Sequence, residues 1–118
     1  MIRQTASSSY GGCYSVSGTC NRTLTANPIK SDHQLLANVP ESFSFIADGF
    51  DASPRTTPHA DQVTIMGYGT DGGVGVVTRP VGDGHSVNFA WAAGYRTSLT
   101  LQDQNVQQLY KNAVKYAC

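Results

Sequence analysis

The densest group of polar side chains with catalytic potential lies in segment 48–61. It contains three carboxylates, an arginine and a histidine, namely Asp48, Asp51, Arg55, His59 and Asp61. A histidine beside carboxylates can act as a general base or bind a divalent metal, because a carboxylate orients the imidazole and supports its charge. One hypothesis is therefore a small hydrolase that uses His59 with Asp51, Asp61 and His85. The alternative is structural, with Arg55 paired to Asp51 on a braced loop.

The three histidines form a second candidate constellation. His33, His59 and His85 each fall at the end of an expected element, and such ends can meet on one rim of a fold as a three-imidazole metal site. The chain has no HxH or HxxxH pair to fix that geometry, and ordinary roles at a helix start and a strand start explain His33 and His85 equally well. No metal or other cofactor is therefore predicted.

Aromatic side chains suggest a third kind of site. Trp91 and Tyr95 flank a small-residue loop at the end of an expected strand, where ligands often bind. Flat rings bury a large area at little entropic cost, so these two residues, with Arg55, are the candidate contacts for a carbohydrate or peptide. Tyr10, Tyr14 and Tyr68 are further candidates for such a platform, and the alternative for all of these rings is a place in the core.

The cysteines bear on the compartment. Cys13 and Cys20 are six residues apart in a Gly- and Ser-rich stretch, a spacing that suits a small disulfide loop and lacks the paired CxxC motifs of a zinc site. Cys118 is left free or pairs between chains. The disulfide and the low charge content favour an extracellular or periplasmic protein, whereas three reduced thiols in the cytoplasm is the alternative. The sequon Asn21-Arg22-Thr23 agrees with export in a eukaryote.

Composition excludes two classes of partner. Eight basic and eight acidic residues give a formal net charge of +0, and no cluster of Lys or Arg marks a nucleic-acid or membrane-binding surface. Apolar runs are only a few residues long, so we expect neither a transmembrane span nor a signal peptide. A chain of 118 residues has room for one domain.

The C-terminal segment 103–117 predicts an amphipathic helix. Its apolar side chains recur at steps of three and four, namely Val106, Leu109, Tyr110, Ala113, Val114 and Ala117. The opposite, polar face carries Gln107, Gln108, Lys111, Asn112 and Lys115. Asp103 is placed to accept the first free amides as the N-cap. Such a helix needs a sheet to cover, and the expected landing site is Val87, Phe89 and Trp91.

Three strands are expected before that helix, over 62–68, 73–79 and 85–91. The first two carry apolar residues on both faces, which indicates a central position in the sheet. The Gly-rich turns between them are too short for parallel returns, so they predict an antiparallel meander.

The first half of the chain is less regular. Segment 1–30 shows no sustained period and is expected to be loop, with at most one short strand around Leu24. Ser31 or Asp32 is expected to cap a helical turn over 31–36, and the alternation at Phe43 and Phe45 predicts a strand. Segment 47–60 is expected to be a long surface loop.

Four segments together resemble the C-terminal half of class I glutamine amidotransferase-like domains: Asp32–Pro40, Val63–Met66, Gly82–Phe89 and Leu101–Val106. The similarity is to non-amidotransferase members, including the trehalose-utilisation type and the trimerisation domain of some beta-galactosidases. In this chain Gln34 replaces the usual proline. The family's N-terminal half has no counterpart, and no apolar strand precedes Cys13 to hold it on a nucleophile turn. The resemblance therefore transfers no catalytic residue.

The expected fold is α/β or α+β, an antiparallel-rich sheet with a C-terminal amphipathic helix as a partial flavodoxin-like or amidotransferase-like fold. Its parts are an irregular segment 1–30 and a half-domain 31–118. Half of such a fold leaves a sheet edge uncovered, so we expect a homo-oligomer and a non-catalytic interaction or assembly module. The small hydrolase and a carbohydrate-binding module are the two alternatives.

Overall fold

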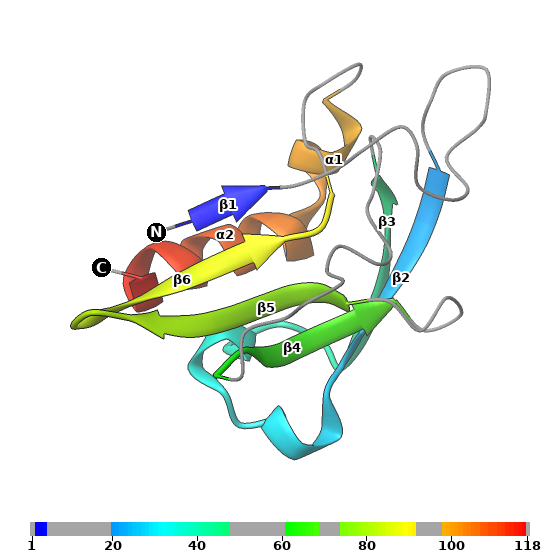
Figure 1. The fold of residues 1–118 in the computed structure, drawn as a ribbon. Helices are drawn as coiled ribbons and strands as arrows, with labels where there is room; N and C mark the ends of the chain where they lie inside the picture. Colours follow the sequence, from blue (N-terminus) through cyan, green and yellow to red (C-terminus); the bar gives the residue numbers. More distant parts are fainter. Residues whose placement is uncertain (1, 5–19, 48–60, 69–73, 92–97, 118) are drawn as a thin grey trace.

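The computed structural model describes residues 2–4, 20–47, 61–68, 74–91 and 98–117. Its strands are β1 (Ile2–Gln4), β2 (Cys20–Ala26), β3 (Ser42–Ala47), β4 (Val63–Tyr68), β5 (Val74–Val81) and β6 (Gly84–Phe89). Its helical segments are the 3-10 turns η1 (Pro28–Lys30) and η2 (Gln34–Leu36) and the α-helices α1 (Leu99–Gln102) and α2 (Gln104–Ala117). Figure 1 shows their arrangement.

The described strands form one sheet in the order β1-β6-β5-β4-β2-β3. Every neighbouring pair is antiparallel except β1 and β6, which run parallel. The antiparallel-rich sheet with a C-terminal helix confirms the α+β part of the expected fold class. It also places β4 and β5 in the interior of the sheet, as their apolar faces predict.

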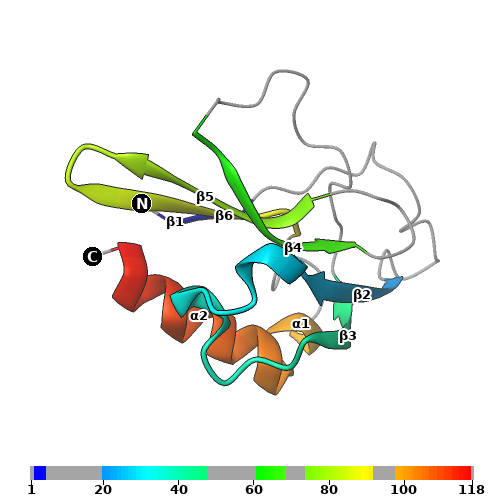
Figure 2. The same cartoon turned by 90° about the horizontal axis from the view of Figure 1, so that it is seen from below.

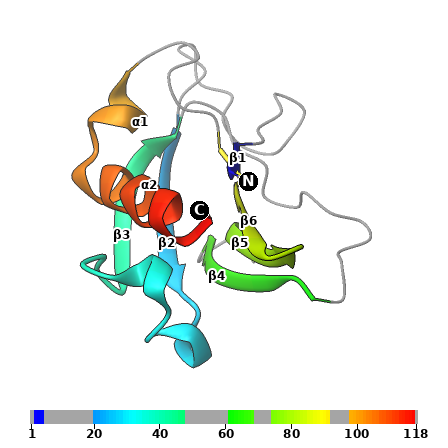
Figure 3. The ribbon, with the colours of Figure 1, turned by 90° about the vertical axis from the view of Figure 1, so that its left-hand side faces the viewer.

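The sheet curls around α2, which lies on its concave side (Figures 2 and 3). The buried core fills the space between them and includes Val87, Phe89 and Trp91, the predicted landing site of the helix. The ring centroid of Phe89 lies 4.9 Å from that of Tyr110 on α2. Burial of apolar side chains from both elements therefore joins the helix to the sheet.

The predicted meander is confirmed for β4, β5 and β6. The turn between β5 and β6 consists of Gly82 and Asp83, and Gly82 has a φ of +58°. Positive φ at the first of two turn residues is typical of a type II′ hairpin, which fits the twist of the flanking strands. A short turn of this kind forces the two strands into antiparallel register.

Helix α2 begins as the sequence predicts. The carboxylate of Asp103 accepts hydrogen bonds from the backbone N–H groups of Asn105 at 2.9 Å and Val106 at 3.0 Å. These bonds satisfy two of the amides that have no partner inside the helix. The helix is thereby fixed at its first turn, next to α1.

The apolar stripe predicted for α2 is wrong at two positions. Val114 is 56% exposed, whereas Asn112, assigned to the polar face, is 5% exposed. The side-chain Nδ2 of Asn112 donates to the carbonyl oxygens of Leu35 at 2.9 Å and Ala37 at 2.8 Å. A buried amide is stable there because these carbonyls satisfy its N–H groups.

The segment before β3 contains more structure than predicted. Strands β1 and β2 both lie within the stretch expected to be loop, and β2 holds the strand expected around Leu24. The turn expected over 31–36 is present as η2, which follows η1. Its cap is His33 and not Ser31 or Asp32, since the His33 ring accepts the Leu35 amide.

Candidate functional site

Two of the three histidines meet at one corner of the molecule, where they contact Tyr116 near the end of α2. We call His33, His85 and Tyr116 the histidine corner. The His85 ring stacks on Tyr116 with centroids 4.2 Å apart and 25° between the planes. His33 meets the same ring edge-on at 4.9 Å. The third histidine, His59, lies outside the described residues.

His33 serves the backbone at this corner. Its Nδ1 accepts the N–H of Leu35 at 3.0 Å, so the neutral ring carries its proton on Nε2. Burial lowers the pKa of His33 from 6.5, and the nearby charges of Lys30 and His85 lower the pKa further. A proton on Nδ1 would displace the Leu35 amide. The geometry therefore favours the neutral imidazole. Its unprotonated nitrogen, Nδ1, caps η2 and is not available as a general base.

The same corner is tied to the helix by Asn112. Its two bonds to the carbonyls of Leu35 and Ala37 hold η2 against α2. The start of β6 also approaches closely, because a Cβ added at Gly84 would lie 3.3 Å from the carbonyl oxygen of Ala117. The histidine corner is thus a packed junction of η2, β6 and α2.

The described residues contain no group of three or more His, Cys, Asp or Glu side chains that could hold a metal ion. A three-imidazole site would need His59 as well, and that residue is outside the described ranges. His33 and His85 both contact the Tyr116 ring. Within the part of the chain that the structure describes, the pair is organised around an aromatic ring.

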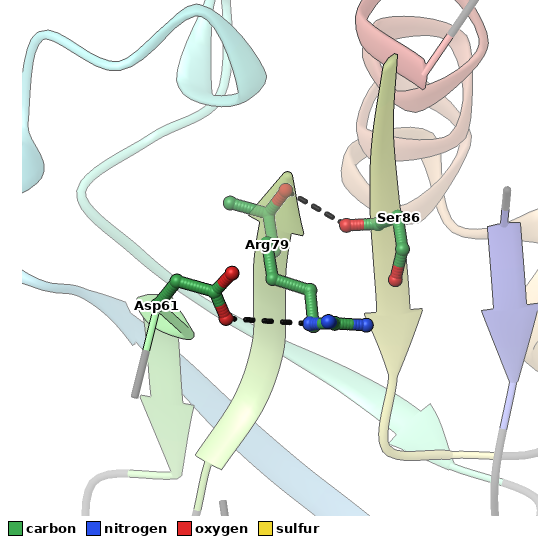
Figure 4. Close-up of polar contacts among 4 residues, drawn as sticks. Asp61, Arg79 and Ser86 are labelled. Atoms are coloured by element: carbon green, nitrogen blue, oxygen red, sulfur yellow. Dashed lines mark hydrogen bonds and ion pairs between the residues drawn. The ribbon is translucent and has the colours of Figure 1, made fainter. Parts of the chain in front are cut away.

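Asp61 lies on the other side of the sheet from His85. It pairs with Arg79 at 3.4 Å, and both side chains are partly exposed (Figure 4). Arg79 is in register with Ser86, so the two side chains lie on the same face of the sheet. His85 precedes Ser86, and its side chain therefore lies on the opposite face from that of Arg79. The structure does not bring Asp61 to His85. The remaining members of the predicted hydrolase cluster, Asp48, Asp51, Arg55 and His59, lie outside the described residues.

Trp91 is a core residue, which corrects its predicted role in an exposed stacking surface. Its side chain is fully buried, and its ring packs against Phe45 and Phe89 with centroids 5.1 Å away in each case. The indole Nε1 donates to the Tyr110 hydroxyl at 2.8 Å. Burial raises the pKa of Tyr110 to about 12, although this hydrogen bond acts in the opposite direction.

The other aromatic candidates do not provide a described platform either. Tyr68 is buried, and its hydroxyl donates to the carbonyl of Ala90 at 2.7 Å. Tyr10, Tyr14 and Tyr95 lie outside the described residues.

Of the cysteines, Cys13 and Cys118 also lie outside the described residues. Cys20, the predicted disulfide partner of Cys13, is the first residue of β2. None of the helices that the structure describes is long and apolar enough to cross a membrane.

Strand β3 lies at one end of the described sheet and pairs there with β2 alone. The amide of Ala26 donates to the carbonyl of Glu41. This bond shows which residues of β3 turn their backbone groups toward β2, because hydrogen-bonded and non-hydrogen-bonded pairs alternate along the ladder. It follows that Phe43 and Phe45 direct their backbone groups toward β2, whereas those of Ser42, Ser44 and Ile46 point away from it. We call this outward row the β3 edge.

One end of the β3 edge is covered by α1. The hydroxyl of Thr100 donates to the carbonyl of Ile46, and Thr100 itself is fully buried. Its neighbours Leu99 and Leu101 are 47% and 42% exposed. The helix therefore seals Ile46 and leaves Ser42 and Ser44 as the open part of the edge among the described residues.

The exposed face of the same strand is lined with hydroxyl groups. Thr23 and Ser44 share a hydrogen bond of 2.8 Å across the β2–β3 ladder, and Thr25 and Ser42 share one of 3.2 Å. Strand β3 contains no charged residue and no proline. Natural edge strands usually carry such residues because they discourage pairing with another chain.

Comparison with family models, with curated proteins and with solved structures gave no match to this chain. Its function is therefore inferred from the geometry of the described residues. Sequence reasoning predicted the strand at β3 and an uncovered edge somewhere in the sheet, without assigning that edge to β3. The missing signal is the β2–β3 pairing, which joins segments separated by the two 3-10 turns.

Proposed function

We propose that this protein is a non-catalytic assembly module that associates with itself through the β3 edge. The observation that carries the proposal is the row of outward backbone groups at Ser42 and Ser44, on a strand without charge or proline. Adding a strand to such an edge satisfies these groups by main-chain hydrogen bonds, which supply affinity without a preformed pocket.

The histidine corner differs from the β3 edge, because its polar groups are already engaged within the protomer. There the imidazole of His33 and the amide of Asn112 are engaged by backbone groups of the protomer, so they serve its packing. Asp61 is paired with Arg79, and Trp91 is buried. Among the described residues, the hydrolase and carbohydrate alternatives therefore have no supporting arrangement.

The proposal includes kinship with the C-terminal half of amidotransferase-like domains. The described order of turn, strand, antiparallel hairpins and closing helix follows the segments that carry the resemblance. A half-domain of that kind leaves an edge of its sheet uncovered, and we assign the uncovered edge to β3, where a second copy would pair.

The proposal is tested by Ser44→Pro. The N–H of Ser44 points away from β2, so proline removes a donor from the open edge while leaving the β2–β3 ladder bonds in place. We expect the wild type to show a mass that rises with concentration in light scattering, and the variant to remain a monomer over the same range.

Ser44→Ala is the matched control, because it loses the hydroxyl but keeps the N–H, and it should still associate in the concentration range in which Ser44→Pro is a monomer. If proline at position 44 prevents folding, Ser42→Pro provides a second test at the first residue of the strand, where proline is best tolerated. A wild type that stays monomeric from micromolar to millimolar concentration would refute the proposal, as would a folded Ser44→Pro variant with unchanged association.

A further inference from the structure

The open part of the β3 edge is short enough to specify how two copies would pair. Its outward groups belong to Ser42 and Ser44, and the next outward carbonyl, that of Ile46, already accepts the Thr100 hydroxyl. An antiparallel partner must therefore bond to the two serines and avoid the end that α1 covers. This requirement selects among the possible registers.

Resting on the proposed self-association, we infer that β3 pairs antiparallel with β3 of a second copy about a two-fold axis at Phe43. Ser42 of each copy then lies opposite Ser44 of the other. Both residues of such a pair direct their N–H and C=O groups at each other, so the two pairs form four main-chain hydrogen bonds. Each carbonyl of Ile46 keeps its bond to Thr100.

The neighbouring registers use the edge less well. A two-fold axis at Ser44 would place the Ser42 amide against the Ile46 carbonyl of the second copy, where α1 already packs. An axis at Phe45 would bring Ser44 to the same covered end. Only the axis at Phe43 matches both open residues of one copy to both open residues of the other.

The side chains on the exposed face agree with this register. Ser42 is already bonded to Thr25, and Ser44 is bonded to Thr23. Placing Ser42 beside Ser44 of the second copy joins these pairs into one continuous row of hydroxyl groups across the interface, a favourable kind of cross-strand pairing. Glu41 lies opposite Phe45 of the second copy, so the two Glu41 carboxylates do not face each other.

Cysteine cross-linking tests the register. In a hydrogen-bonded antiparallel pair the Cα atoms are about 5.5 Å apart, within the range that a disulfide spans, whereas positions displaced by two residues are beyond about 7 Å. A mixture of Ser42→Cys and Ser44→Cys protein should give on mild oxidation a disulfide between positions 42 and 44. Neither variant alone should form a disulfide at its new cysteine.

Peptide mapping by mass spectrometry identifies the linked positions and separates them from links made by the native cysteines. Hydrogen exchange on the unaltered protein is the second measurement, since the Ser42 and Ser44 amides should become protected as the dimer forms. A 44-to-44 link, or no 42-to-44 link in a mixture that still dimerises, would overturn the register and leave the proposed function standing. A wild type that does not associate overturns both.

Discussion

The histidine corner and the β3 edge are both rich in polar groups, but they use them in opposite ways. At the corner, the carbonyls of Leu35 and Ala37 accept both N–H groups of Asn112, and His33 caps the Leu35 amide. At the edge, the backbone groups of Ser42 and Ser44 point out of the described sheet. Polar groups satisfied within the protomer stabilise its fold, whereas an open row of them is available to a partner.

The contrast predicts the largest effect on protomer stability at Asn112. Asn112→Ala leaves the carbonyls of Leu35 and Ala37 without their buried donor, and we expect the free energy of unfolding to fall by about 2 to 3 kcal/mol. Urea denaturation followed by circular dichroism measures this loss.

Gln108→Ala is the matched control for Asn112→Ala. Gln108 donates a hydrogen bond to the side-chain oxygen of Asn112 at 3.0 Å. Replacing Gln108 removes this bond and leaves in place the two bonds from Asn112 to the carbonyls of Leu35 and Ala37. Its loss should lower the free energy of unfolding by less than about 1 kcal/mol. Equal losses for the two variants would mean that the ties to η2 do not hold the corner together.

We expect the protonation of His33 at low pH to lower the free energy of unfolding by an intermediate amount. Because burial lowers the pKa of His33 in the folded state, the unfolded chain binds the proton more readily. The contribution of the neutral ring is complete above about pH 6.5, its unfolded value, and is lost as the pH falls from there toward the lowered folded pKa. Lys30 and His85 are the charged groups that lower the pKa of His33 further, and the Tyr116 ring packs edge-on against the imidazole.

His33→Asn isolates that titration, because asparagine also accepts the cap hydrogen bond but carries no ionisable group. Urea denaturation of both proteins at several pH values between about 5 and 8 should show a smaller loss on acidification for the variant. Parallel curves would assign the pH dependence to other residues.

The smallest effect on the protomer is expected at the edge. Ser42→Ala removes an exposed hydroxyl bond of 3.2 Å to Thr25, and we expect the free energy of unfolding to change by no more than about 0.5 kcal/mol. Denaturation at a concentration too low for association measures the protomer alone. A loss as large as that of Asn112→Ala would remove the distinction between the two regions.

Local patterns predicted the elements that later pack together. The extent of α2, its Asp103 cap, the alternation at Phe43 and Phe45 and the short turn between β5 and β6 are all features of neighbouring residues, and each has the expected structure. These signals act over a few positions, so the sequence alone is sufficient to show them.

The features that the sequence did not predict depend on contacts between distant segments. Asn112 is buried because Leu35 and Ala37, more than seventy residues earlier, offer it two carbonyls, whereas Val114 is exposed on the same helix. The cap at His33 and the edge position of β3 have the same origin in long-range geometry. A helical period reports which residues share a face, and it does not report what that face meets.

The shortness of β1 would limit how far the proposed association through β3 could proceed. A two-fold pairing consumes the same edge on both molecules, so the described sheet would then end on each side at β1, a parallel strand of three residues. Head-to-tail addition would have to match six residues of β3 with these three. Among the described strands, the proposed pairing would therefore close at two copies instead of extending into a fibril.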